Sequence, residues 1–203
     1  MQPVEKGRRY TSDEFLAMTG LPECCELLDG IIYVNGKVYD YYTSSAPVQM
    51  SAAPNQRHQR IVGGIYRRIA DHIDAHNGKC EVFISPSDVR LNDEDIVQPD
   101  VFVVCDPEKL DGQYCNGAPD WVIEVLSPSD ENRDTVKKLY KYSDAGVREY
   151  WIISPEDERV IVYPFGTTKV TGLFTFDDNV PAGIYKDSPD PLTICVASLL
   201  NKK

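Results

Sequence analysis

The residues with the clearest chemical potential are two carboxylates and a lysine. Asp100 opens the apolar run 101–104, which places a carboxylate at the mouth of a predicted strand. Glu124 interrupts the apolar run 121–126, where a lone carboxylate is costly to bury unless a cation, a proton or a basic partner neutralises it. Two carboxylates on neighbouring strands, with Lys138 on the following helix, predict a site for one or two hard divalent cations. Such a cation would lower the pKa of a bound water, and the lysine would orient that water.

Each of these three residues also has a structural explanation. Asp100 could cap a turn. Glu124 could form a buried ion pair with Arg133 or Lys138. Lys138 could be a surface lysine paired with Asp134, which lies four residues earlier on the same helix face. Two carboxylates can also hydrolyse a substrate without metal, as in glycosidases, so their separation and a metal-free assay would discriminate between these chemistries.

The charge distribution bears on what such a site could bind. A net charge of −11 looks unfavourable for a protein that holds phosphates. Almost all of the excess lies in residues 88–134, which hold 13 acidic and three basic residues. The flanking segments 57–79 and 133–148 each hold five basic and two acidic residues. This pattern is compatible with a cation site beside a phosphate-binding rim, although on charge alone a solvated acidic surface is the simpler explanation.

The elements that must position these side chains alternate between helices and strands. Residues 11–14 read as the capping box of a short helix, and Asp29-Gly30 and Asn35-Gly36 predict hairpin turns. Isoleucines recur every four residues across 56–77, which predicts a long helix, and Gly63-Gly64 within it predicts a close packing contact. A second helix is predicted at 132–143, entered through the signal at 127–130. Further strands are predicted at 80–85, 88–91, 101–105, 121–126, 149–153 and 159–165, with one or two more after residue 171.

This order of elements predicts an α/β fold with a mixed central β-sheet flanked by helices, N-terminal hairpin additions and a single domain over residues 1–203. The sequence contains no run of about 18 apolar residues, so we expect no membrane span. Its first residues lack the apolar stretch of a signal peptide, so we expect a cytoplasmic location. The six cysteines form no CxxC pair and are expected to be free thiols. His72 and His76 lack the further ligands of a structural zinc site.

Several segments resemble one known family in order and spacing. They are Gln98-Pro99-Asp100-Val101, the run 121–129, Asp134-x-x-x-Lys138-x-Tyr140 and the run 145–151, with 25–30 and 58–61 as N-terminal landmarks. Together they resemble the Uma-two family of restriction endonuclease domains, which belongs to the PD-(D/E)XK nuclease superfamily. The resemblance extends from about Tyr10 to Phe165 and implies a restriction-endonuclease-like fold.

The resemblance also implies roles for individual residues. Asp100 and Glu124 become metal carboxylates, Glu26 an additional acidic ligand, and Mg²⁺ or Mn²⁺ the cofactor. The superfamily pattern places a lysine two residues after the Glu, where this chain has Leu126. The resemblance therefore assigns the role of catalytic lysine to Lys138 on the following helix, with Lys137 as the alternative. Two further residues are candidates for accessory roles. Asp88 heads a predicted strand and could join the acidic cluster or have a structural role, and Tyr140 could brace the site through its hydroxyl or occupy a half-buried helix position.

The expected activity is endonucleolytic hydrolysis of DNA, and a homodimer would provide two sites for cutting both strands. Phosphate contacts are expected from basic residues of the two helices: Arg57, Arg60, Arg67, Lys137 and Lys141. The alternative is a catalytically inactive nuclease-fold domain that binds a nucleic acid or a protein partner. Convergence of the predicted site residues is the feature that bears on this choice, because fold resemblance does not establish activity.

Overall fold

The computed structural model describes residues 4–5, 7–22, 24–34, 36–39, 55–127, 132–167 and 171–200, with backbone alone for 132–134. Three predictions lie outside these residues. They concern the helix entry at 128–130, the position of Asn35 in the second predicted turn, and the side-chain pairings of Arg133 and Asp134.

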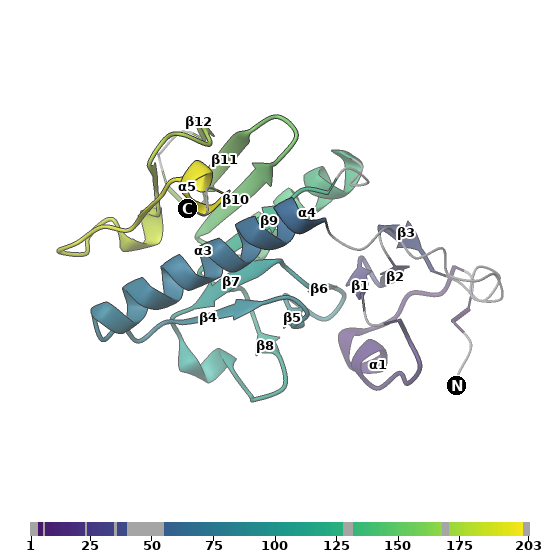
Figure 1. Cartoon of the computed structure of the whole chain (residues 1–203). Coiled ribbons are helices and arrows are strands. Elements are labelled where there is room, and N and C mark those ends of the chain that lie inside the picture. The colour runs from purple at the N-terminus through teal and green to yellow at the C-terminus, as the bar shows by residue number, and fades with distance from the viewer. Residues whose placement is uncertain are drawn as a thin grey trace.

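A six-stranded mixed sheet forms the centre of the molecule (Figure 1). β9 and β10 run parallel, and the helix α4 (Asn132–Ala145) connects them. The other neighbouring strands are antiparallel. The mixed α/β fold predicted from the sequence is therefore confirmed. From one edge to the other, the strands are β12 (Gly172–Thr175), β11 (Arg159–Pro164), β10 (Glu149–Ser154), β9 (Trp121–Val125), β7 (Val101–Val104) and β4 (Glu81–Ile84).

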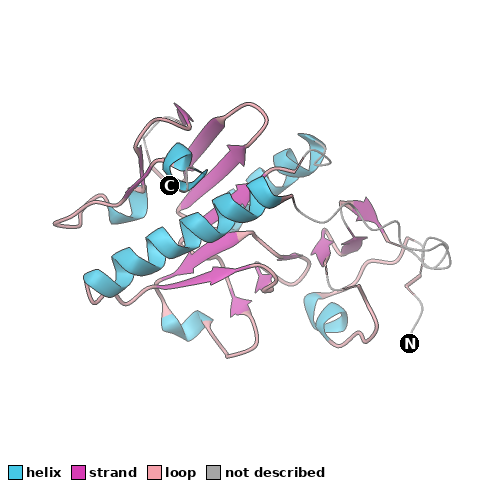
Figure 2. Ribbon diagram, viewed as in Figure 1, coloured by secondary structure: helices cyan, strands magenta, loops and turns pink. Residues whose placement is uncertain are grey.

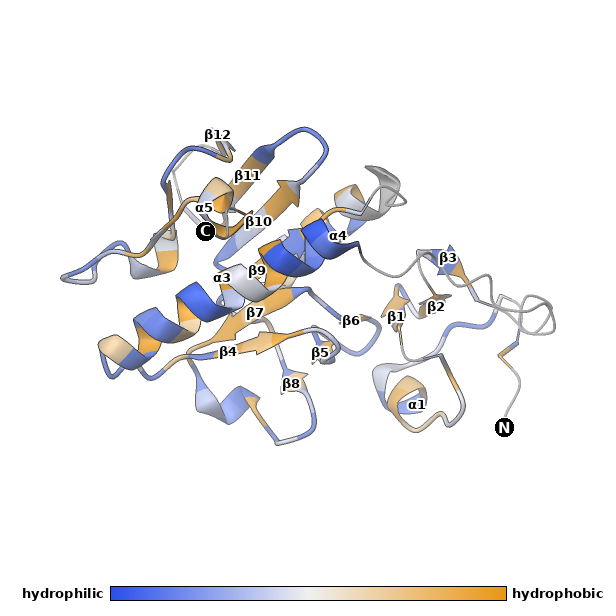
Figure 3. Ribbon diagram, viewed as in Figure 1, coloured by the Kyte–Doolittle hydropathy of each residue, from blue (hydrophilic) through white to orange (hydrophobic). Residues whose placement is uncertain are grey.

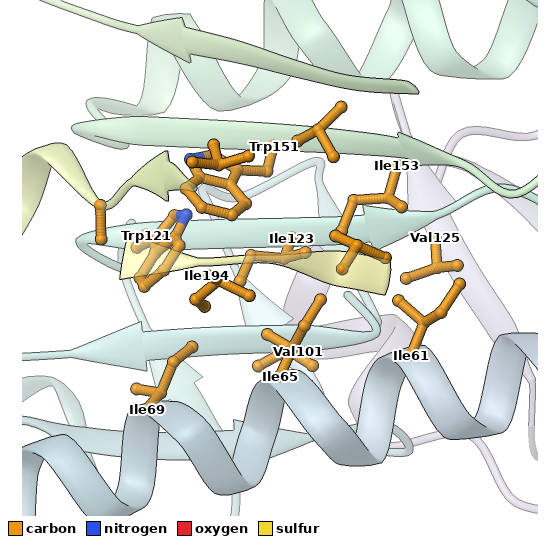
Figure 4. Packing of buried hydrophobic residues seen from close by; sticks show 14 of the residues in the cluster. Ile61, Ile65, Ile69, Val101, Trp121, Ile123, Val125, Trp151, Ile153 and Ile194 are labelled. Carbon is orange, nitrogen blue, oxygen red and sulfur yellow. The ribbon is translucent and has the colours of Figure 1, made fainter. Parts of the chain in front are cut away.

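The long helix α3 (Gln56–Ala75) lies across one face of this sheet (Figure 2). Its outer side is hydrophilic, while the strands beneath are strongly hydrophobic (Figure 3). Ile61, Ile65 and Ile69 are fully buried and point toward Val101 and Trp121 of the sheet (Figure 4). The predicted four-residue repeat is therefore the core face of a helix. On the opposite face of the sheet, buried side chains of β7, β9 and β10 pack against α4.

Specific contacts hold α3 at its N-terminus and near its middle. The Asn55 side chain accepts a hydrogen bond of 2.9 Å from the His58 amide, which caps the N-terminus. Near the middle, a Cβ on Gly64 would lie 3.0 Å from the Leu199 side chain, in the short helix α5 (Val196–Leu200). The close contact predicted at Gly63-Gly64 is confirmed at Gly64, whereas Gly63 faces open space. The position and register of α3 are therefore fixed.

The N-terminal hairpin belongs to a second six-stranded sheet beside the first. Asp29 and Gly30 have φ values of 53° and 72°, as a two-residue hairpin turn requires. The capping box at Thr11 and Glu14 is present at the start of α1 (Ser12–Leu16). The strand order is β3 (Lys37–Val38), β2 (Ile31–Val34), β1 (Cys25–Leu28), β6 (Ile96–Val97), β5 (Val89–Arg90) and β8 (Cys115–Asn116).

The C-terminal segment adds the strand β12 and a hairpin of β13 (Val180–Pro181) and β14 (Thr193–Ile194). Two 3₁₀ turns, η1 (Pro107–Lys109) and η2 (Gly183–Tyr185), complete the described elements. In the described part of the chain, no helix is long and apolar enough to cross a membrane.

The expectation that every cysteine is a free thiol is wrong for one pair. Cys80 and Cys105 form a disulfide. They lie just outside the register pair formed by Glu81 of β4 and Val104 of β7, so antiparallel pairing places them opposite each other. This proximity depends on a strand pairing across 25 residues, which cysteine spacing alone does not reveal.

Candidate active site

Strand pairing brings two of the predicted site residues together. Val101 of β7 pairs with Ile123 of β9, so the next positions, Asp100 and Glu124, lie opposite each other. The amide of Val125 donates a hydrogen bond of 2.8 Å to Oδ2 of Asp100. The carboxylate of Asp100 is thereby attached to the neighbouring strand. The two residues come from neighbouring strands, as the sequence predicted.

The second sheet delivers the third carboxylate. Glu26 lies on β1, and its Oε1 accepts a hydrogen bond of 2.9 Å from the amide of Gln98. The side chain of Gln98 donates a hydrogen bond of 2.8 Å to Asp88. Glu26 therefore reaches the segment that precedes Asp100, while Asp88 is a partner of Gln98.

Lys138 of α4 joins the two sheets at this point. Its Nζ lies 2.9 Å from Oε1 of Glu26 and 3.0 Å from Oε1 of Glu124. The three side chains are largely buried, with exposed fractions of 16%, 18% and 13% for Lys138, Glu26 and Glu124. The rival Lys137 points elsewhere, because its Nζ lies 3.2 Å from the hydroxyl of Tyr33. The structure thus places Lys138, and not Lys137, beside the carboxylates.

A tyrosine braces the site, but at a different position from the one predicted. The hydroxyl of the fully buried Tyr142 donates a hydrogen bond of 2.9 Å to Oε1 of Glu124. Tyr140 is 65% exposed, so both its bracing role and its half-buried alternative are wrong. Helical geometry explains the difference. Residue 142 lies four positions after Lys138 on the same face, whereas residue 140 lies on the opposite side.

Burial and charge crowding shape the protonation of these groups. The pKa of Glu124 is raised to about 7, mainly by burial and also by repulsion from Asp100 and Glu26, against the opposing effect of Lys138. Burial works to lower the pKa of Lys138, but Glu124 and Glu26 raise it well above its usual value. Lys138 thus pairs with Glu26 and Glu124, and Asp100 adds a third negative charge beside Glu124, so one ammonium is too little for all three carboxylates to ionise without cost.

His58 is a site residue that the chemical reasoning from sequence missed. Its Nε2 lies 3.4 Å from Oδ2 of Asp100, and its side chain is 8% exposed. It occupies the first turn of α3, on the face that carries the buried isoleucines. A histidine at core spacing, just before a run of buried isoleucines, was the available signal.

The carboxylates have the oxygen donors that hard divalent cations prefer. The contacts described here fall on one oxygen of each: Oε1 of Glu26, Oδ2 of Asp100 and Oε1 of Glu124. Within the described residues, however, no three His, Cys, Asp or Glu side chains are grouped as a ready metal site. Lys138 instead occupies the place between Glu26 and Glu124. The donor set therefore fits a cation, provided that the lysine gives way.

The five basic residues predicted to contact DNA differ in their availability. Three already have partners: Arg57 pairs with Glu158, Lys137 contacts Tyr33, and Lys141 pairs with Asp29 and Asp95. Arg60 and Arg67 are exposed and, across the described ranges, form no ion pair with a carboxylate. Both line a groove of about 430 Å³ that runs along α3 where it meets Leu199 of α5. The groove is lined by Gln56, Gln59, Arg60, Gly63, Gly64, Arg67 and Leu199.

Comparison with known proteins agrees with this architecture. A crystal structure described as "a putative nuclease belonging to DUF820", from Anabaena variabilis, superposes with a TM-score of 0.67 at 21% identity, covering 93% of this chain and 96% of that one. This likeness supports the fold. An uncharacterised protein of Synechocystis sp. is 28% identical over 111 residues, which are 54% of this chain and 57% of that protein. The chain thus matches little more than half the length of this curated relative.

The family assignment rests on a longer match. The model of the Uma2 family, described as "Putative restriction endonuclease", matches residues 39–181. This range contains Asp100, Glu124 and Lys138, while Glu26 precedes it. The chain therefore belongs to the Uma2 family.

Proposed function

We propose that this protein is a Mg²⁺- or Mn²⁺-dependent endonuclease that hydrolyses phosphodiester bonds of DNA. The observation that carries the proposal is that Glu26 and Glu124 share Lys138 while Asp100 lies opposite Glu124 on the neighbouring strand, with one oxygen of each carboxylate outside the described contacts. Three carboxylates and one ammonium leave uncompensated negative charge in a largely buried place. Such a place favours a divalent cation, because a cation relieves the repulsion.

In this proposal, different residues of the site have different roles. Asp100 and Glu124 would hold the cation, with Glu26 as a third ligand. Tyr142 and the amide of Val125 hold these side chains in orientation. A bound cation would supply a water of lowered pKa and neutralise charge on the phosphate. Lys138 would orient the attacking water, and its raised pKa keeps it a hydrogen-bond donor at neutral pH.

The direct test is nicking of supercoiled plasmid DNA after the protein has been stripped of metal with EDTA. We expect cleavage on addition of Mn²⁺ and none in EDTA. Asp100→Asn should abolish cleavage. Glu108→Gln, at an exposed carboxylate of the same acidic segment, should cut like the wild type. Wild-type protein that neither nicks DNA nor binds Mn²⁺ in calorimetry would contradict the proposal.

One observation favours a second candidate, a nuclease-fold domain that binds a nucleic acid or a protein partner without cutting. Lys138 already forms ion pairs with Glu26 and Glu124, so the cluster also works as a buried structural tie between α4 and the two sheets. DNA binding without Mn²⁺-dependent cleavage in the same assay would select this candidate. The homodimer and the cytoplasmic location stay predictions.

A further inference from the structure

We infer that His58 is a positioning residue that holds Asp100 in the orientation a metal ligand needs. The inference rests on the proposed function. Nε2 of His58 lies 3.4 Å from Oδ2 of Asp100, and both side chains are largely removed from solvent.

The fold fixes where the imidazole lies. The backbone amide of His58 donates a hydrogen bond to the side chain of Asn55, the residue that caps the start of α3. The next residues on the same face include Ile61 and Ile65, both fully buried against the central sheet. Leu199 contacts the helix at Gly64. A helix held at these points cannot rotate or slide without disrupting the core, so His58 stays beside Asp100, where β7 begins.

Two contacts meet on one oxygen of Asp100. The amide of Val125 donates to Oδ2 from β9, and His58 faces the same oxygen from α3. With its proton on Nε2, the imidazole is a second donor to this oxygen. Donors on two sides restrict rotation of the carboxylate, while Oδ1 carries neither contact. Partners of this kind around a ligating side chain typically change metal affinity by about 10–100-fold when they are removed.

The test compares three substitutions in the full chain, with Mn²⁺ as the probe. A Gln side chain can place its amide nitrogen near the position of the imidazole Nε2, whereas the shorter Asn reaches the position of Nδ1. We expect His58→Leu and His58→Asn to weaken Mn²⁺ binding about tenfold in titration calorimetry. His58→Gln should retain most of the wild-type affinity. His76→Leu, an exposed position at the other end of α3, should bind Mn²⁺ like the wild type.

The outcomes separate this inference from the proposed function. If the wild type binds Mn²⁺ and His58→Leu and His58→Asn bind it equally well, the role of His58 is overturned while the metal site stands. If the wild type does not bind Mn²⁺, both are overturned. The Gln–Asn pair guards against a folding defect, because both are polar amides at the same buried position. Equal affinities of these two variants would also contradict a positioning role.

Discussion

At the scale of single residues, the central feature is that two carboxylates, those of Glu26 and Glu124, share the ammonium of Lys138. Because Glu26 and Glu124 both contact its ammonium, neutralising one carboxylate does not leave the lysine alone. We therefore expect Glu124→Gln to abolish Mn²⁺-dependent nicking while the metal-free free energy of unfolding holds or rises, since repulsion is relieved. The double variant Glu26→Gln, Glu124→Gln strands a buried cation and should cost about 3–5 kcal/mol. Urea unfolding in EDTA measures both. A large loss in the single variant would contradict the shared arrangement.

The raised pKa of Glu124 gives a pH dependence with a definite sign. The carboxyl titrates near 4.5 when exposed and at about 7 in the folded protein, so the folded state binds the proton more tightly. Its contribution to stability is fully present below about 4.5 and is lost as the pH rises through about 7. In EDTA, the melting temperature of the wild type relative to Glu124→Gln should therefore fall across this interval. A constant difference would contradict the raised pKa.

At the scale of elements, the sequence was most informative where a periodic pattern sets a surface. The isoleucine repeat predicted α3, observed at Gln56–Ala75, and the apolar runs predicted β7 and β9. The strands β6 and β8 were missed, because two-residue strands are defined by backbone pairing with distant segments rather than by local pattern.

The same contrast holds for the candidate site. Asp100 and Glu124 stood out because each places a carboxylate in or beside an apolar strand. The contacts of Glu26 with Gln98 and of His58 with Asp100 depend on tertiary packing across 72 and 42 residues. Tyr142 was within reach of sequence reasoning, since a spacing of four from Lys138 places both on one helix face.

The groove on α3 yields a prediction at this scale. Arg60 and Arg67 flank Gly63, whose missing side chain leaves the groove open, and both face solvent. If they contact phosphates, replacing both with Gln should weaken DNA binding and reduce the slope of log K against log salt by about two. Arg68→Gln is the matched control, because this exposed arginine does not line the groove. Filter binding over a salt series measures the slope, and an unchanged slope in the double variant would remove the groove from the DNA interface.

At the scale of the whole molecule, the site lies where two sheets and a helix meet. The central sheet supplies Asp100 and Glu124, the second sheet supplies Glu26, and α4 ties the two together. Lys138 bridges Glu26 and Glu124, and one turn later Lys141 pairs with Asp29 and Asp95, which adjoin β1 and β6 of the second sheet. A cation at this junction would therefore stabilise the assembly of the two sheets as well as support chemistry.

This arrangement predicts competition between Lys138 and a metal ion. In Lys138→Met the carboxylates of Glu26 and Glu124 lose their shared ammonium, so the metal-free protein should be less stable than the wild type by about 3–5 kcal/mol. Mn²⁺ should then raise its melting temperature more than it raises that of the wild type, because no ammonium must be displaced before the ion binds the folded state. Lys137→Met, which loses a contact with Tyr33, should respond to Mn²⁺ like the wild type. Thermal melts in EDTA and in millimolar Mn²⁺ measure these differences. An equal or smaller Mn²⁺ effect in Lys138→Met would show that the lysine does not compete for the place between Glu26 and Glu124.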